Sequence, residues 1–294
     1  MQRFRLKSVF RWLILTAVVF FLVRALHQHW EEVTRLRITA AGVACLAIAL
    51  GVTLFAHIFA GFVWGWILRF LSYRVSGVWS AQTYLKTNIA KYLPGNVWHF
   101  YGRINAAKRI GIEIAPATLS LLLESLLMAA AACFFAIAGF RSWVQFGIAM
   151  PWLTLCVFVI LIGVHPFFLN LVLRKLKKTE PVKLDRYPLI PLVGELGFLG
   201  LRAIGFVLVF LALRPISGSE LPLLISGFAW AWLLGFVIPG LPGGVGVFEA
   251  IAVAIFSQQF PSAQVIGAVA LYRFVNTLAE GLGAGLAAID GSRR

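Results

Sequence analysis

Long apolar runs with few charges constrain this chain more than any other feature of its sequence. Five of them occupy residues 38–70, 115–139, 144–164, 189–213 and 262–289. About 20 apolar residues in a helix cross the roughly 30 Å hydrocarbon core of a bilayer. Only 13% of the residues are charged, whereas soluble domains carry about 25%. Together with a shorter run at 12–23, the pattern predicts an all-α integral membrane protein with about six full transmembrane helices.

Basic residues lie between the apolar runs and not along one face of a helix. The net charge is +15, and most Lys and Arg residues precede the first run or lie near 69–74, 108–109, 174–186 and the C-terminus. Loops rich in Lys and Arg stay on the cytoplasmic side of a membrane during insertion. We therefore expect a multi-pass protein of the bacterial cytoplasmic (inner) membrane with both termini in the cytoplasm. No nucleic-acid partner is expected.

Two further segments, 78–112 and 220–259, are interrupted by Pro and Gly. The breaks are Pro94-Gly95-Asn96 in the first segment and a run rich in Pro and Gly at 239–244 in the second. A helix that such residues stop after about 16 to 19 residues barely crosses the membrane core. Each segment is therefore predicted to be a re-entrant hairpin of two half-helices that returns to its side of entry.

The order span, hairpin, span occurs twice along the chain. Repeats of this kind in membrane proteins often have opposite topology, and the positions of the basic loops require it here. The chain is then one polytopic membrane domain, 1–294. Its expected parts are an N-terminal signal-anchor helix and loop (1–37), repeat 1 (38–139), a linking helix and basic cytoplasmic loop (140–188) and repeat 2 (189–290).

Two pairs of glycines four residues apart lie in the predicted spans. Gly61 and Gly65 precede the first hairpin, and Gly281 and Gly285 lie in the last span. Small residues at this spacing let helix backbones approach closely. We expect both pairs to be packing contacts within the molecule and not a dimer interface.

Charged residues at matching places in the two repeats indicate a polar centre. Arg103 follows the first break and Glu124 lies in the next span, whereas Glu249 follows the second break and Arg273 lies in the last span. A charge at membrane depth is costly and usually faces a partner in the protein interior. Because the signs are exchanged between the repeats, we expect cross-pairing, either Arg103 with Glu249 or Glu124 with Arg273.

Further polar residues share helix faces with this set. Glu195 and Arg202 are seven residues apart in the run at 189–213 and form a secondary polar seam. Arg273, Asn276 and Glu280 lie on one face of the last span. The alternative interpretation is that these charges are static ion pairs that fix helix packing and touch no ligand.

The two breaks add an expected anion site. In a hairpin that dips into the membrane, the second half-helix starts at depth with free backbone N–H groups and a positive dipole end. Asn96 is a natural N-cap for a helix that starts near Val97. Gly243, Gly244 and Gly246 allow close backbone approach before the second half-helix. Two such ends are expected to bind a phosphate group between them.

Basic side chains near the first break fit the same chemistry. Lys91 and Arg103 bring cations to the centre, and a guanidinium group can bind a phosphate through two hydrogen bonds. His99 lies four residues before Arg103 on the same helix face and is a candidate ligand contact. These three residues complete the expected headgroup site.

Signatures of an enzyme are missing from the sequence. It has no GxSxG, Walker or HExxH motif, and its three cysteines stand alone without CxxC spacing. No catalytic residue, cofactor or metal is therefore expected, and the protein is not expected to be an enzyme.

The two interrupted segments also resemble a known family. The stretches Lys91-Tyr-Leu-Pro-Gly-Asn-Val-Trp-His-Phe-Tyr-Gly-Arg103 and Ile238-Pro-Gly-Leu-Pro-Gly-Gly-Val-Gly-Val-Phe-Glu-Ala250 are similar to the flippase-like membrane domain of the lysylphosphatidylglycerol synthase transmembrane family, in its standalone form. The first stretch departs from the commoner motif, which has Gly-Glu between the Pro and the Arg. The resemblance implies a central polar set of Pro94, Gly95, Arg103, Glu124, Pro242, Gly243, Gly244, Gly246, Glu249 and Arg273.

The resemblance implies lipid translocation without lipid aminoacylation. We expect a protein that moves or binds an anionic, phosphate-bearing lipid, either a phospholipid or a lipid-linked intermediate. Two alternatives stay open: a non-transporting membrane scaffold for a partner enzyme that modifies lipids or glycans, and an intramembrane enzyme that acts on a lipid substrate.

Overall fold

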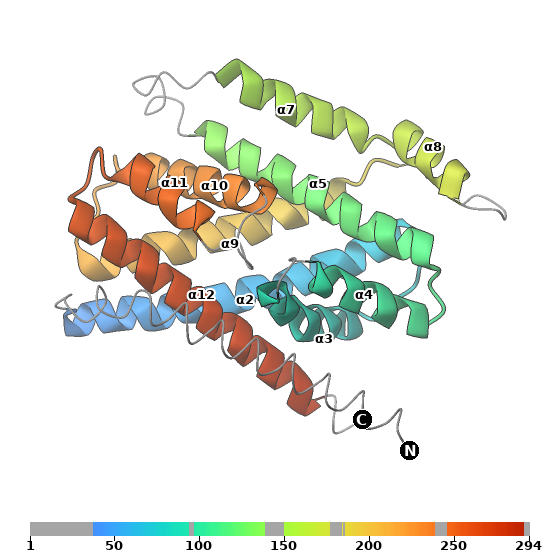
Figure 1. The fold of residues 1–294 in the computed structure, drawn as a ribbon, viewed down its shortest axis with the longest axis horizontal. Coiled ribbons are helices and arrows are strands. Elements are labelled where there is room, and N and C mark those ends of the chain that lie inside the picture. The colour runs from blue at the N-terminus through green and yellow to red at the C-terminus, as the bar shows by residue number, and fades with distance from the viewer. Residues whose placement is uncertain are drawn as a thin grey trace.

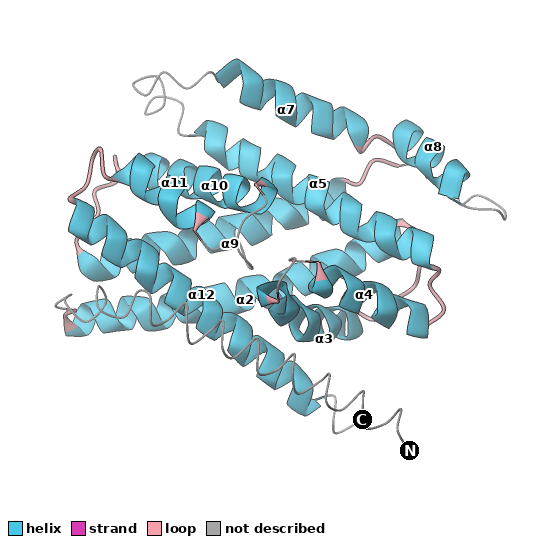
Figure 2. Cartoon of the chain, in the orientation of Figure 1, coloured by secondary structure: helices cyan, strands magenta, loops and turns pink. Residues whose placement is uncertain are grey.

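The computed structural model describes residues 38–93, 97–138, 150–176, 184, 186–238 and 246–290. Within these residues every regular element is a helix (Figure 2). The predicted all-α class is therefore confirmed for the part of the chain that is described. The run at 12–23 and both termini lie outside it, so the predicted signal anchor and the cytoplasmic termini stay predictions.

Among the described residues, four helices are long and apolar enough to cross a membrane. They are α2 (Ala40–Phe70), α5 (Ile114–Ala138), α9 (Leu189–Leu213) and α12 (Ser262–Asp290). They match four of the six predicted spans. Of the run at 144–164, the structure describes α7 (Met150–Gly163), which is followed by α8 (Pro166–Leu176) (Figure 1).

Both interrupted segments form separate shorter helices, as predicted. The first contains α3 (Gly77–Asn88), the 3-10 turn η1 (Ile89–Tyr92) and α4 (Trp98–Arg109). The second contains α10 (Leu221–Val237) and α11 (Val247–Phe256). Figure 1 shows α3 and α4 in one half of the molecule and α10 and α11 in the other half. The breaks themselves, 94–96 and 239–245, lie outside the described residues.

Local sequence explains where several of these helices begin and end. The Thr39 hydroxyl caps α2 by accepting a hydrogen bond from the Gly42 backbone N–H at 3.2 Å. Gly111, with a φ of +87°, ends α4, because a left-handed residue breaks the helical repeat at little cost only when it is glycine. Because the turn at Gly111 is short, α4 and α5 lie side by side.

Helix α2 packs along α9 through small residues. A Cβ atom on Gly42 would lie 2.5 Å from the Ala212 carbonyl oxygen, and one on Gly194 would lie 2.8 Å from Val63 Cγ2. Gly61 faces α3, where a Cβ atom would lie 2.5 Å from the Ala81 Cα. Close backbone approach of this kind is a main source of helix association in lipid.

One of the two predicted glycine contacts is confirmed, and the other has no counterpart among the described residues. Gly61 and Gly65 both lie against α3, and Gly65 faces the Ser80 side chain. A Cβ atom on Gly281 or Gly285 would meet nothing within 4 Å among the described residues. Gly283, which lies between them, faces Leu85 of α3 and Leu54 of α2, so the glycine contact of this helix lies on a different face from the predicted one.

Contacts between the two halves of the described chain occur in matched pairs. Helix α3 packs against α12 and α10 packs against α5, while α5 packs against α9 and α12 packs against α2. In chain order, α2, α3, α4 and α5 correspond to α9, α10, α11 and α12. Each contact between two of these helices has a counterpart between the two corresponding helices. In Figure 1, α2 and α9 run in opposite directions, as do α5 and α12.

Aromatic rings form the core of the second half. Phe206 of α9 is fully buried and lies 5.2 Å from both Phe210 and Tyr272, measured between ring centroids. The rings of Phe228 and Phe256 lie 5.3 and 5.5 Å from Phe206. Because offset and edge-to-face ring contacts pack with little freedom, this cluster holds α9, α10, α11 and α12 in register.

Candidate functional site

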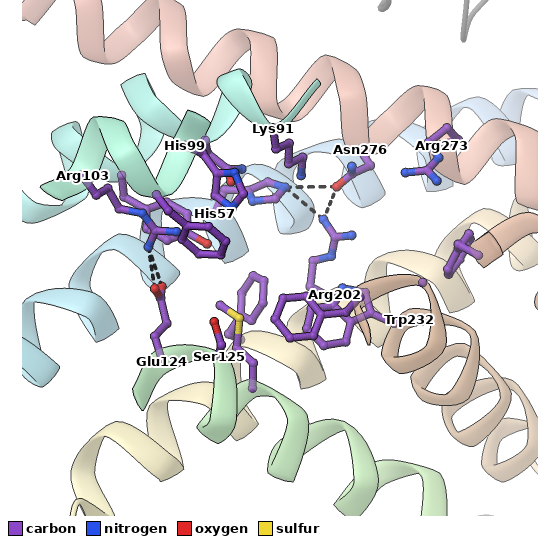
Figure 3. A pocket seen from close by; sticks show the side chains of 18 of the residues that line it. His57, Lys91, His99, Arg103, Glu124, Ser125, Arg202, Trp232, Arg273 and Asn276 are labelled. Carbon is purple, nitrogen blue, oxygen red and sulfur yellow. Dashed lines mark hydrogen bonds and ion pairs between the residues drawn. The ribbon is translucent and has the colours of Figure 1, made fainter. Parts of the chain in front are cut away.

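A cavity of about 330 Å³ lies at the centre of the molecule, between the two pairs of shorter helices (Figure 3). Its polar lining consists of His57, Asn88, Lys91, His99, Arg103, Glu124, Ser125, Arg202, Arg273 and Asn276. Its aromatic lining consists of Tyr84, Phe100, Phe198, Trp232, Phe236, Phe248 and Tyr272. Basic groups and aromatic rings therefore share one cavity among helices long enough to span a membrane.

The first charge pair joins the two helices that follow the first break. Arg103 of α4 donates from Nη1 to both carboxylate oxygens of Glu124 of α5, at 2.8 and 2.6 Å. Both side chains are buried, and Figure 3 shows them pointing toward each other. A charge pair removed from water in this way is strongly destabilised when only one partner is lost.

Aromatic rings surround the Arg103 guanidinium group. Its central carbon lies 4.6 Å from the Tyr84 ring centroid, 5.6 Å from that of Phe100 and 5.7 Å from that of Trp64. The faces of these rings attract a cation, and they restrict the rotamers of the side chain. Arg103 is therefore held in place before any ligand arrives.

The second charge pair joins α11 and α12. Arg273 donates from Nε to Glu249 Oε1 at 2.6 Å. The other oxygen, Oε2, accepts the backbone N–H of Gly246 at 2.6 Å, so Glu249 also caps the start of α11. Gly246 has a φ of +95°, a conformation that glycine adopts without strain. The carboxylate therefore fixes both a helix end and an arginine at the cavity wall.

The predicted cross-pairing between the repeats is wrong. Arg103 pairs with Glu124 and Arg273 pairs with Glu249, so each pair lies within its own half of the chain. The reason is local connectivity, because a short turn joins α4 to α5 and another joins α11 to α12. The exchange of signs is nevertheless real: the arginine is on the shorter helix in the first half and on the long helix in the second.

A third polar cluster does connect the two halves. Lys91 Nζ of η1 donates to Glu280 Oε1 of α12 at 2.6 Å, and Asn276 Nδ2 donates to the same oxygen at 3.0 Å. The Tyr92 and Thr277 hydroxyl groups lie 3.3 Å apart. These contacts dock the end of the first half-helix onto the last long helix.

Arg202 enters this cluster from α9. Its Nη1 lies 3.0 Å from His57 Nε2 and donates to Asn276 Oδ1 (Figure 3). His57 Nε2 in turn lies 3.1 Å from Asn276 Oδ1 and 3.3 Å from Glu280 Oε1. Three long helices, α2, α9 and α12, and the turn η1 are thus joined by a branched network around His57 and Asn276.

Arg202 differs from the other cations of the cavity in its partners. Arg103, Arg273 and Lys91 each lie within 2.6 Å of a carboxylate oxygen. Arg202 contacts His57 and Asn276, and no carboxylate among the described residues lies within ion-pair distance of it. One positive charge at the cavity is therefore matched only by neutral groups.

Most of the predicted site residues meet at this cavity. Lys91, His99, Arg103, Glu124, Arg202, Arg273 and Asn276 line it, and Glu249 and Glu280 pair with lining residues. Gly246 lies at the start of α11. Glu195 is buried but does not line the cavity. The predicted residues Pro94, Gly95, Asn96, Pro242, Gly243 and Gly244 lie outside the described part of the chain.

Helix α4 begins one residue later than predicted. Its first helical residue is Trp98, and Val97 occupies the N-cap position without a side-chain hydrogen bond. The predicted capping by Asn96 falls on a residue that the structure does not describe.

Neither His57 nor the aromatic lining was among the predicted site residues. The apolar stretch 40–68 contains no Lys, Arg, Asp or Glu, and His57 is its one histidine. An isolated ionisable side chain of this kind in a membrane span is itself a sign of function. Tyr84, Trp232, Phe248 and Tyr272 carried no such signal, because aromatic residues are common in every apolar run of this chain. Only the crossing of the helices brings them together.

Comparison with known proteins gives little further information. The sequence matches no protein-family model. An uncharacterized protein from Synechocystis sp. (strain ATCC 27184 / PCC 6803 / Kazusa) is 32% identical to it over 101 residues. The match covers 33% of this chain and 31% of that protein's length.

Proposed function

We propose that this chain binds an anionic, phosphate-bearing lipid at the central cavity and moves it across the cytoplasmic membrane. The observation that carries the proposal is the cavity in which four cations line the wall and Arg202 has only neutral partners among the described residues. A monoanionic phosphate is the simplest ligand that satisfies such a charge, because guanidinium groups match its geometry with paired hydrogen bonds.

The size of the cavity supports a headgroup as the ligand. About 330 Å³ is near the lower end of small-molecule sites, which span roughly 300 to 1,000 Å³. A headgroup fits this volume, while long acyl chains do not. The chains would stay in the bilayer, and the aromatic side chains of Trp232, Phe236 and Phe248 would contact the part of the lipid between headgroup and chains.

The arrangement of the helices supports movement of the ligand. The matched contacts and the opposite directions of equivalent helices are the pattern expected of two inverted repeats. In this interpretation α3 with α4 and α10 with α11 are re-entrant hairpins that enter from opposite faces and approach the cavity from each side. Rocking of one repeat against the other would expose the cavity first to one face and then to the other.

Basic residues support the proposed orientation. Arg69, Lys108 and Arg109 lie in the last turns of α2 and α4, at the end of the molecule where α12 also ends. Arg214 follows α9 at the opposite end, where it pairs with Glu220. The end that carries the larger number of basic residues is then the cytoplasmic one.

The family resemblance agrees with this proposal. Arg103, Glu124, Glu249 and Arg273, which belong to the central polar set that the resemblance implies, form the two ion pairs at the cavity wall. The flippase-like activity that the resemblance implies is the same class of function.

Reconstitution in liposomes tests the proposal against its alternatives. The assay follows fluorescent phosphatidylglycerol, phosphatidylcholine and a polyprenyl phosphate from one leaflet to the other. We expect protein-dependent movement of an anionic lipid and little movement of phosphatidylcholine. A scaffold gives no movement, and an intramembrane enzyme gives a new lipid product.

A matched pair of variants locates the activity. Arg202→Gln removes the cavity cation without a carboxylate partner, and Arg214→Gln removes a half-exposed arginine at the end of α9. Movement of the anionic lipid should be lost in the first variant and kept in the second. Equal activity of the two variants would contradict a role of the cavity.

A further inference from the structure

Glu195 is a buried carboxyl group that the cavity chemistry does not use. Its relative exposure is 0%, and neither carboxyl oxygen forms a hydrogen bond with any described residue. It lies on α9 but does not line the cavity. The other acids of the site, Glu124, Glu249 and Glu280, are each paired with a cation at 2.6 Å.

An unpartnered carboxylate in a dry membrane interior is strongly disfavoured. The same side chain as a neutral carboxylic acid removes most of that cost by binding one proton. In the arrangement that the structure shows, Glu195 is therefore the acid form. A buried acid of this kind, beside a site for charged ligands, is a typical proton carrier in transporters.

The charged groups that act on Glu195 belong to the first ion pair. They are Glu124 of α5 and Arg103 of α4. Tyr84 of α3 also interacts electrostatically with the Glu195 carboxyl group. Helix α10, which also packs against α9, has no ionisable side chain. The affinity of Glu195 for its proton therefore depends on the charge and position of Arg103 and Glu124.

Groups around Arg202 lie farther along the same helix. Arg202 is seven residues from Glu195, about 10 Å along the helix axis. His57 of α2 and Glu280 of α12 surround it there. These groups belong to the third polar cluster and not to the immediate surroundings of Glu195.

Arg103 has capacity for a further acceptor. Its Nη1 holds Glu124, but its buried Nε donates to no described residue. Two anions can use this remaining capacity, namely an ionised Glu195 that rotates toward the guanidinium group and a phosphate in the cavity. They exclude each other, because one guanidinium group cannot neutralise three anions at close range.

We propose that Glu195 is a proton-binding site coupled to the lipid site, so that one lipid phosphate and one proton bind together. The proposal rests on the function proposed above. At a pH where Glu195 is ionised in the unliganded protein, its carboxylate takes one proton from water as the anion enters and returns it as the anion leaves. With Glu195 neutral, four cations face three carboxylates and one positive charge remains for a monoanionic phosphate. An ionised Glu195 cancels that charge.

Calorimetry with a soluble lipid tests this coupling. Dioctanoyl phosphatidylglycerol is a suitable probe, because its phosphodiester carries one negative charge throughout the neutral pH range. Titrations in two buffers with different ionisation enthalpies give the number of protons taken up per lipid. We expect uptake approaching one proton at a pH where Glu195 is ionised in the unliganded protein, and up to tenfold weaker binding per pH unit above its titration.

Two variants isolate the residue. Glu195→Gln keeps the shape of the acid form, so it should bind the lipid without proton uptake and with a flat pH profile. Glu220→Gln removes an acid outside the cavity and should keep the uptake of the wild type. Proton uptake that persists in Glu195→Gln, or wild-type binding without any uptake, would overturn the coupling while leaving lipid binding intact.

Infrared spectroscopy tests the protonation itself without lipid. The wild type should show the carbonyl band of a buried carboxylic acid, which disappears at high pH and is missing in Glu195→Gln. Absence of this band at every pH would overturn the inference even if the variant does not fold. Failure of every form to bind the anionic lipid would contradict the proposed function, and the coupling with it.

Discussion

Removing one partner of the Arg103–Glu124 pair should cost far more stability than removing both. Glu124→Ala leaves the Arg103 charge among the rings of Tyr84, Phe100 and Trp64, where it is only 3% exposed. A buried charge without its partner costs about 3 to 5 kcal/mol. Both hydrogen bonds to Glu124, at 2.8 and 2.6 Å, are lost in the same step.

The double variant Arg103→Met with Glu124→Leu replaces the pair by apolar side chains of similar volume. Such replacements are often neutral or stabilising, because the cost of removing two charges from water disappears with them. We therefore expect the double variant to recover most of the loss, with a coupling free energy of about 3 kcal/mol or more between the two positions. Lipid binding should still be weakened in it.

The assay is reversible unfolding in mixed micelles, followed by the fluorescence of the Trp residues. The Arg214–Glu220 pair serves as the control, because its N–O distance is 2.5 Å but both side chains are 24% exposed. Glu220→Ala should cost only about 0 to 1 kcal/mol. If Glu124→Ala costs as little as Glu220→Ala, or if the two cavity substitutions are additive, the argument from burial is refuted.

Three further predictions concern packing and the loop after α9. Phe206→Ala should destabilise the protein by about 3 to 5 kcal/mol in the same assay, because the ring is fully buried against five other aromatic rings; a loss below 1 kcal/mol would contradict this. Gly42→Ala should cost about 1 to 3 kcal/mol, because its Cβ would lie 2.5 Å from a backbone oxygen of α9, whereas Gly285→Ala should be neutral. The backbone N–H of Ser217 holds the pKa of Glu220 below its usual value of about 4.3, so this contact stabilises the loop above that pH and is lost as the pH falls through the folded-state pKa. Proteolysis of the loop should rise at that lower pH in the wild type and show no such step in Glu220→Gln.

Membrane helices could be predicted from the sequence because length and hydropathy alone decide whether a segment can cross a bilayer. The described spans α2, α5, α9 and α12 follow the predicted runs closely. The separation of the shorter helices was also predictable, since Pro and Gly stop a helix wherever it lies. Close packing at Gly61 was predictable from its four-residue spacing to Gly65, although the helix that it contacts, α3, was not.

Charge pairing could not be predicted because it depends on which helices are neighbours. The exchanged signs in the two repeats indicated complementary charges, but the turn after α4 places Glu124 next to Arg103 before any helix of the other half can compete. Contact between the halves instead involves Lys91, Glu280 and His57. The spacing of residues along a helix indicates which of them share a face. It does not indicate which other helix packs against that face.

Lipid-dependent stabilisation of the purified protein tests the central claim most directly. A ligand at 100 times its dissociation constant stabilises the folded state by about 2.7 kcal/mol. Phosphatidylglycerol should therefore raise the melting temperature of the wild type clearly more than phosphatidylcholine does, and this difference should shrink in Arg202→Gln but persist in Arg214→Gln. Equal stabilisation by both lipids, unchanged by Arg202→Gln, would mean that the cavity charges hold the fold together and bind no headgroup.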